Sequence, residues 1–121
     1  MKYIQRNTDN NYTMMNNHSA QNTELSLQAK GLLWVLMTNK DDWRPYIEEL
    51  SKRSKNGRDA HRTAFEELKE AGYIRIYRKS SGRGKGVQTY PLVQDIPITD
   101  SYWNYWVSRI EKELSTEVVD N

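Results

Sequence analysis

Apolar residues begin to recur at helical spacing after a polar start. Across residues 27–38 they return every three or four positions, which predicts a helix, and Thr23 or Ser26 is available as its N-cap. A shorter helix is predicted after Pro45, because proline suits the first turn of a helix. This second helix is expected to stop near Ser54.

A third helix of about fourteen residues is predicted behind the turn signal Asn56-Gly57. Gly72 then supplies a left-handed C-cap, since glycine tolerates the positive φ that this position requires. The apolar stripe of the third helix consists of Ala60, Ala64, Phe65, Leu68 and Ala71.

The pattern after Gly72 is that of strands. Residues 73–78 combine β-branched, aromatic and charged side chains, as a half-exposed strand does. Residues 87–93 resume this composition, with Pro91 marking an edge position. The segment 80–86 between them is rich in glycine and cations. We therefore predict a β-hairpin with a basic tip.

The two ends of the chain differ from its middle. Residues 1–22 are expected to form a polar N-terminal arm with one short strand at 12–15. Residues 98–121 are expected to hold an amphipathic helix, from 100 to about 114, and an acidic tail. One side of that helix carries Trp103, Trp106, Val107, Ile110 and Leu114.

The order of these elements predicts the fold class. Three helices followed by a hairpin, over residues 23–97, are typical of a winged helix-turn-helix, so the chain is expected to be mainly α with a β-hairpin. In such a fold the third helix can enter the major groove of DNA, while the hairpin tip lies on phosphates or in the minor groove.

Charge is segregated along the sequence. Residues 1–51 carry −1, residues 52–86 carry +7 and residues 87–121 carry −4, which together give the net charge of +2. A concentrated positive field attracts polyanions, although a solvated basic face is the alternative. The +7 segment coincides with the third helix and the hairpin, so we expect double-stranded DNA as the partner.

The candidate DNA-binding residues lie in two groups. On the third helix, Arg58 and Arg62 fall opposite the apolar stripe, whereas the glutamates at 66, 67 and 70 would repel phosphate, so only its N-terminal half is expected to approach DNA. The full candidate set is Lys55, Asn56, Arg58, Arg62, Thr63, Arg78, Lys79, Arg83 and Lys85.

Other functional classes lack their residues. There is no cysteine and there are only two histidines, so we expect no enzyme, no metal, no cofactor and no small-molecule substrate. His61 is expected to be a partly buried ring held by one hydrogen bond, and His18 has no partner that the sequence identifies. The longest apolar run, residues 32–37, is too short for a membrane span, and the N-terminus does not resemble a signal sequence. We therefore expect a cytoplasmic protein that does not bind membranes.

The aromatic cluster at residues 102–106 allows three interpretations. It packs on the first helix as core, it forms a homodimer seam, or it stacks on single-stranded nucleic acid. Acidic residues flank it, which argues against strand binding and favours a protein contact. The candidate protein-interface residues are Tyr102, Trp103, Trp106 and Ile110.

Four segments carry a resemblance to a known family. They are LSLQAKGLL (25–33), DW (42–43), NGRD (56–59) and ELKEAGYI (67–74). Over about residues 12–97 the chain resembles the N-terminal winged-helix domain of phage and plasmid replication proteins of the replisome-organiser type. The resemblance implies duplex binding at a replication origin or operator. Such proteins commonly continue into a helicase-loading domain, and because this sequence ends at Asn121 we expect no helicase loading.

A second hypothesis belongs to another class. A small protein of a phage or other mobile element could use the same scaffold to bind and inhibit a host protein in replication, transcription or a CRISPR-type nuclease. The acidic, aromatic C-terminal segment motivates this alternative, because it offers a surface other than the basic one.

Overall fold

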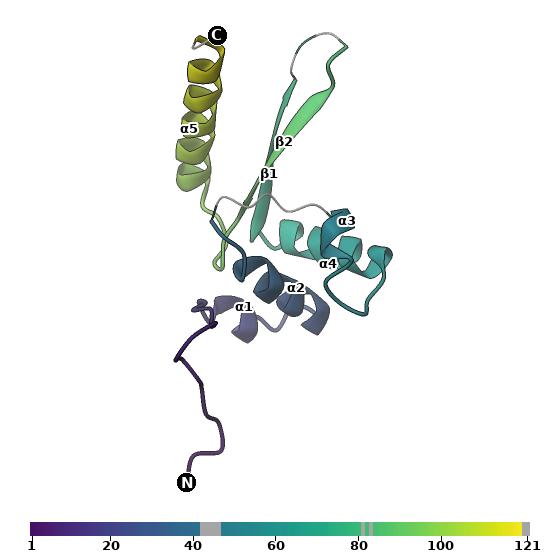
Figure 1. The fold of residues 1–121 in the computed structure, drawn as a ribbon, viewed down its shortest axis with the longest axis vertical. Helices are drawn as coiled ribbons and strands as arrows, with labels where there is room; N and C mark the ends of the chain where they lie inside the picture. Colours follow the sequence, from purple (N-terminus) through teal and green to yellow (C-terminus); the bar gives the residue numbers. More distant parts are fainter. Residues whose placement is uncertain (42–46, 81, 83, 120–121) are drawn as a thin grey trace.

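The computed structural model covers residues 1–121. It describes all of them except 42–46, 81, 83 and 120–121, and it does not describe the side chains of 47–48 and 116–119. Its described part is a mixed α/β structure with one two-stranded antiparallel sheet, compatible with a winged helix (Figure 1). The elements are α1 (His18–Gln21), α2 (Leu27–Met37), α3 (Ile47–Leu50), α4 (Arg58–Glu70), β1 (Ile74–Ser80), β2 (Val87–Val93) and α5 (Asp100–Val119).

Helix α2 begins at the predicted cap. The Oγ of Ser26 accepts a hydrogen bond from the backbone N–H of Ala29 at 3.0 Å, so Ser26 rather than Thr23 is the N-cap. Ser26 also donates through its N–H and its hydroxyl to the carboxylate of Glu67, at 2.6 and 2.8 Å. This carboxylate therefore fixes the start of α2 against α4.

The buried side of α4 carries residues of the predicted apolar stripe. Ala64, Phe65 and Leu68 are buried against α2, whose Leu33 is completely buried. Leu50, the last residue of α3, is also completely buried, which closes the core on that side. Pro45, the predicted start of the second helix, lies outside the described residues.

The junction between α4 and β1 confirms the predicted glycine cap. Gly72 has a φ of +91°, and the N–H of Tyr73 donates to the carbonyl of Leu68 at 3.0 Å. A Cβ on Gly72 would meet Pro97 at 3.5 Å in a backbone conformation that other residues rarely adopt. The tight turn directs β1 away from α4.

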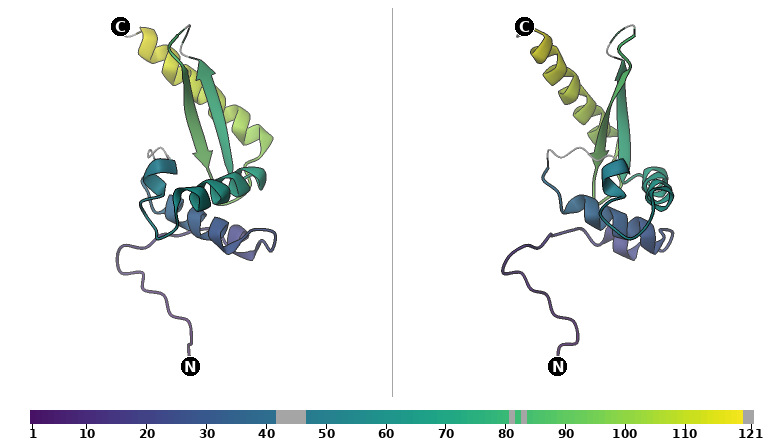
Figure 2. Two further views of the ribbon diagram at one scale, coloured as in Figure 1. Left: turned by 90° about the vertical axis from the view of Figure 1, so that its right-hand side faces the viewer. Right: turned by 45° about the vertical axis from the view of Figure 1, so that its right-hand side comes forward.

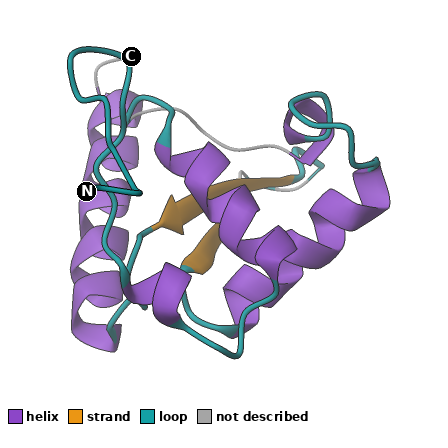
Figure 3. Cartoon of the chain, turned by 90° about the horizontal axis from the view of Figure 1, so that it is seen from below, coloured by secondary structure: helices purple, strands orange, loops and turns teal. Residues whose placement is uncertain are grey.

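The two strands pair from Ile74–Val93 to Ser80–Val87. Seen from the end opposite the hairpin tip, helices surround the foot of the strands (Figure 3). At that foot Ile76 and Val93 pack against the core. The upper part of the hairpin extends beyond the core.

The N-terminal prediction needs two corrections. The prediction of a short strand at 12–15 is wrong, because these residues belong to no helix or strand. Strands β1 and β2 pair with each other, and the backbone N–H of Asn16 donates to Oδ2 of Asp95 at 2.8 Å instead of to a strand. The arm also ends earlier than residue 22, since α1 docks on the core and Ser19 is 1% exposed.

Helix α5 is longer than expected and lies beside both the hairpin and the end of α2. Trp103, Trp106 and Ile110 are half-buried, as predicted for one side of an amphipathic helix. Arg75 and Tyr77 of β1 bind α5, and Trp106 lines a groove with Leu36 and Met37 of α2 and with residues 91–94. None of the described helices has both the length and the apolar character needed to cross a bilayer.

Replacing Tyr73 with phenylalanine tests how α1 is held. Tyr73 is completely buried, and its hydroxyl bonds Nδ1 of His18 at 2.5 Å and Nδ2 of Asn22 at 3.3 Å. Tyr73→Phe should lower the free energy of unfolding by about 1–3 kcal/mol, because partly buried polar groups lose their partner. Urea denaturation measures this, with the exposed Tyr12→Phe as control. Equal stability of the two variants would contradict the docking of α1.

Candidate nucleic-acid interface

The exposed face of α4 carries the predicted residues. Arg58, Arg62 and Thr63 are all exposed, on the side opposite the buried stripe. Gly57 precedes the helix and offers no side chain to cap its first N–H groups. Further along, Glu66 and Glu70 are exposed and Lys69 pairs with Glu66 at 3.3 Å, so the net charge of α4 is positive only in its first two turns.

A buried histidine holds the turn before α4. His61 is 7% exposed; its Nδ1 donates to the carbonyl of Gly57 at 2.8 Å, and its Nε2 bonds the hydroxyl of Ser54 at 2.9 Å. The ring therefore makes two hydrogen bonds, where the sequence suggested one. The same Ser54 oxygen accepts the N–H of Asn56 at 3.3 Å. One imidazole thus shapes the turn that leads into Arg58.

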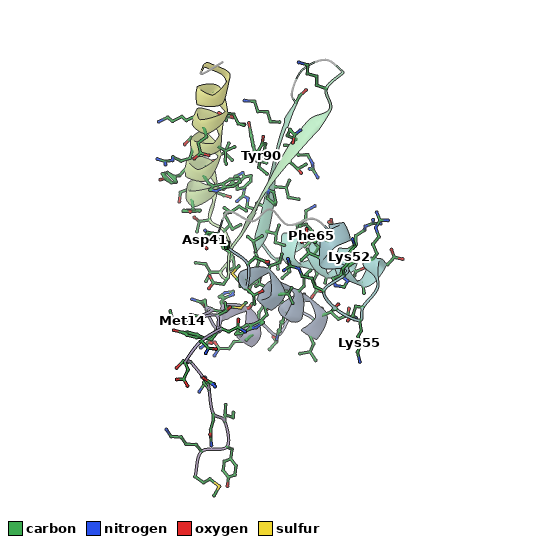
Figure 4. The ribbon with its side chains drawn as sticks, in the orientation of Figure 1. Met14, Asp41, Lys52, Lys55, Phe65 and Tyr90 are labelled. Carbon is green, nitrogen blue, oxygen red and sulfur yellow. The ribbon has the colours of Figure 1, made fainter. Side chains whose placement is uncertain are left out.

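The turn adds cations to this end of α4. Lys52, Lys55 and Asn56 are exposed, and Figure 4 shows both lysines at the end of the molecule where α3 and α4 are joined. Arg53 binds other residues of the chain, because its guanidinium donates to Oδ1 of Asn39 at 2.6 Å and pairs with the carboxylate of Glu49 at 3.4 Å. Lys52 was not among the predicted contacts, although its place in the +7 segment is a signal for it.

The hairpin has two chemically different faces. Arg75 contacts Asp100 of α5 at 2.9 Å, and the hydroxyl of Tyr77 donates to Glu111 at 2.8 Å. Because side chains alternate along a strand, Lys79 shares this face, whereas Arg78 shares the opposite face with Ile76. The structure therefore separates two residues that the sequence placed together, Arg78 and Lys79.

The Arg78 face and α4 are accessible from the same side. In the left view of Figure 2, α4 crosses in front of the foot of the hairpin and α5 passes behind the strands. Arg78 is exposed and Lys79 half-buried. At the tip, Lys85 is exposed between Gly84 and Gly86, which both have positive φ. Arg83 lies outside the described residues.

The predicted protein-interface residues differ in their contacts and in their exposure to solvent. Trp103 and Trp106 stack on each other at 5.4 Å between centroids, and the guanidinium of Arg75 lies 4.9 Å from the ring centroid of Trp103. Trp106 also lines a groove with Leu36 and Met37 of α2 and with residues 91–94, and Ile110 is half-buried. Tyr102 remains 42% exposed.

A further apolar surface was not predicted as a site. Helix α2 exposes Leu27 (85%) and Trp34 (50%). Beside them is a groove of about 350 Å³ between α2 and the start of α4, lined by Leu27, Gly31, Val35, Asn56 and Ala60 among others. An apolar sequence at every position from 31 to 37 is the signal for this surface.

Within the described part of the chain, no three His, Asp or Glu side chains gather in a way that would hold a metal ion. No family model matches the sequence, and comparisons with curated proteins and with solved structures find no match. The functional argument therefore depends on the surfaces themselves.

Replacing His61 with alanine tests its role in the turn. His61→Ala removes both ring hydrogen bonds and leaves a cavity, so the free energy of unfolding should fall by about 2–4 kcal/mol. Chemical denaturation measures the loss. Thr63→Ala, two residues away on the exposed face, should change it by less than about 0.5 kcal/mol. A His61→Ala variant as stable as Thr63→Ala would show that the ring does not hold the turn.

The contact between α5 and the hairpin predicts a pH dependence. The hydrogen bond to Glu111, then burial and the charge of that carboxylate, raise the pKa of Tyr77 above its ordinary 10.0. Because the bond needs the protonated phenol, its contribution is complete below the ordinary tyrosine pKa and is lost as the pH rises through the raised one.

Titration of the tyrosines, followed by phenolate absorbance, tests the raised pKa of Tyr77. One tyrosine should ionise after the exposed ones, and Glu111→Ala should abolish that delay. Glu113→Ala, a nearby exposed carboxylate, should leave it in place. An unchanged titration curve in Glu111→Ala would contradict the contact.

Proposed function

We propose that this protein binds double-stranded DNA as a winged helix-turn-helix. In this proposal α2, α3 and α4 form the helical part and the hairpin is the wing. The single observation that carries it is the exposure of Arg58 and Arg62 on α4 and of Arg78 on the hairpin face turned away from α5. A duplex lying across α4 and this face would meet cations from both elements.

The first two turns of α4 enter the major groove in this proposal. Arg62 reads a guanine edge with two hydrogen bonds, or holds a phosphate, and Thr63 is its neighbour on the same exposed face. Lys52, Lys55 and Arg58 at the start of the helix contact the flanking backbone. Glu66 limits how far along α4 the DNA extends.

The hairpin supplies phosphate contacts. Arg78 lies at the level of the strands and Lys85 at the tip, so the wing follows one backbone away from α4. On the far side of the strands Asp100 and Glu111 belong to an acidic helix, which would repel phosphate there. This distribution of charge orients the duplex toward the α4 side.

The biological setting follows from the sequence resemblance. We propose an origin or operator in a phage, plasmid or other mobile element as the binding site, with a non-enzymatic role in replication or transcription inside the cell and no cofactor. A homodimer reading two half-sites would appear as a palindrome in selected duplexes.

Arg62→Ala tests base reading directly. After selection of bound duplexes, the variant should lose about 1–3 kcal/mol of binding free energy on the preferred duplex and relax preference at one base step. Fluorescence anisotropy measures both. Lys69→Ala is the matched control, since this cation lies in the last turn of α4 and pairs with Glu66 at 3.3 Å. Equal affinity of both variants would contradict the orientation of α4.

Salt dependence tests the extent of the phosphate contacts. If about five phosphates are neutralised, log affinity should fall against log salt with a slope near −4.5. A flat salt response, or no binding at low salt, would exclude the duplex interface.

A second candidate function is inhibition of a host protein through α2. The observation that favours it is the uncharged, exposed surface formed by Leu27 and Trp34 beside the apolar groove. In this alternative Trp34→Ala abolishes capture of the host protein after nuclease treatment, and Arg62→Ala leaves it intact. The opposite pattern would exclude it.

A further inference from the structure

Helix α5 has a second face that carries exposed tyrosines and cations, and at one end of it Tyr102 lines a groove with residues 91–94. Tyr102, Tyr105, Arg109 and Lys112 are spaced three or four residues apart, so they share one side of the helix, and all are exposed. The half-buried residues Trp103, Val107, Ile110 and Leu114 occupy the side against the hairpin. We call the first group the tyrosine face.

Charge on α5 is sorted between these two sides. Arg109 and Lys112 are the only lysine or arginine residues between 87 and 121, and both lie on the tyrosine face. Asp100 and Glu111 are bound to Arg75 and Tyr77 on the hairpin side. These two of the acids that flank the aromatic cluster therefore lie on a different side of the helix from the tyrosines. Glu113, which is exposed, borders the tyrosine face one turn beyond Arg109.

The two tyrosines are arranged as neighbouring platforms. Their ring centroids are 5.9 Å apart, the rings are tilted by 43°, and Tyr102 and Tyr105 are 42% and 54% exposed. Bases of a single strand stack on exposed aromatic rings, and cations beside the rings hold the phosphates. Over the ten residue steps from Tyr102 to Lys112 the face extends about 15 Å along the helix, enough for a few nucleotides.

We propose that the tyrosine face is a second nucleic-acid site, which binds single-stranded DNA or RNA by stacking on Tyr102 and Tyr105 with phosphate contacts to Arg109 and Lys112. In Figure 1 the hairpin stands between α5 and α4, so the proposed site on α5 is separate from the proposed duplex surface on α4. The site does not depend on the duplex proposal.

Binding of a single strand in the presence of duplex tests the proposal. A labelled oligothymidylate of about twelve nucleotides is titrated with the full chain, once alone and once with an excess of unlabelled duplex. Tyr105→Ala should weaken oligothymidylate binding about fivefold or more, and Tyr105→Phe should restore it, because the ring and not the hydroxyl stacks. Tyr12→Ala is the matched control, since Tyr12 is also 54% exposed but lies in the N-terminal arm.

Two further measurements separate stacking from simple charge attraction. An abasic oligomer of equal length keeps the phosphates and should bind the wild-type protein about as weakly as oligothymidylate binds Tyr105→Ala. Arg109→Ala should reduce the salt slope by about 0.7, the contribution of one phosphate of a single strand. Glu113→Gln should strengthen binding, because it removes the carboxylate bordering the face.

Several outcomes would overturn the proposal. Equal affinity of wild type, Tyr105→Ala and Tyr12→Ala would show that the face does not stack bases. If Tyr105→Ala instead halves the molecular mass in sedimentation equilibrium, the face is a seam between two copies of the chain. The duplex proposal has a separate readout: Arg62→Ala should weaken duplex binding and leave oligothymidylate binding unchanged, and its failure would leave the Tyr105 result standing.

Discussion

The arrangement of α1, α4, the hairpin and the segment leading to α5 depends on two adjacent residues, Gly72 and Tyr73. Gly72 ends α4 in a left-handed conformation, and its carbonyl accepts the N–H of Ile98 at 2.8 Å. The carbonyl of Tyr73 accepts the N–H of Gln94 at 2.9 Å, and its buried hydroxyl binds His18 and Asn22. Helix α4, both strands, α1 and the segment leading to α5 are thus joined at one point, which sets the angle between α4 and the hairpin.

That angle determines which charges can act together. The hairpin leaves the core with Ile76 facing inward, and the alternation of side chains then places Arg78 on the side of α4 and Arg75 on the side of α5. Arg75 is neutralised by Asp100. A chain with a net charge of only +2 can therefore present a basic surface on one side and an acidic helix on the other. Such a separation favours a polyanion that approaches from the α4 side.

Most of the fold could be predicted from local signals. Ser26, the turn before Arg58 and the Gly72 cap fixed three helix boundaries, because capping and positive φ depend on one residue and its immediate neighbours. The docking of α1 could not be predicted, since it depends on His18 meeting Tyr73, 55 residues away. The prediction of a strand at 12–15 was wrong for a similar reason, because composition does not show whether another strand has a free edge with which the segment can pair.

The candidate site was predictable in composition but not in arrangement. Periodicity placed Arg58 and Arg62 on the exposed face of α4, where they are found. Alternation along a strand puts Arg78 and Lys79 on opposite faces, but it could not show which of them lies on the side of α5, because that is decided by the partners Asp100 and Glu111. The same contacts bind two of the acids that flank the aromatic cluster, Asp100 and Glu111, on the hairpin side of α5, whereas Tyr102, Tyr105 and Arg109 are exposed on another side of the helix.

In the proposed function, α4 and one face of the hairpin form a single surface for duplex DNA. Amide chemical shifts of the labelled protein, followed during titration with duplex, would map this surface. Large shifts are expected at Arg58, Arg62 and Arg78, and small ones at Tyr105 and Trp34. Shifts confined to α2 or to α5, with α4 and the hairpin unchanged, would exclude a duplex surface on α4 and the hairpin.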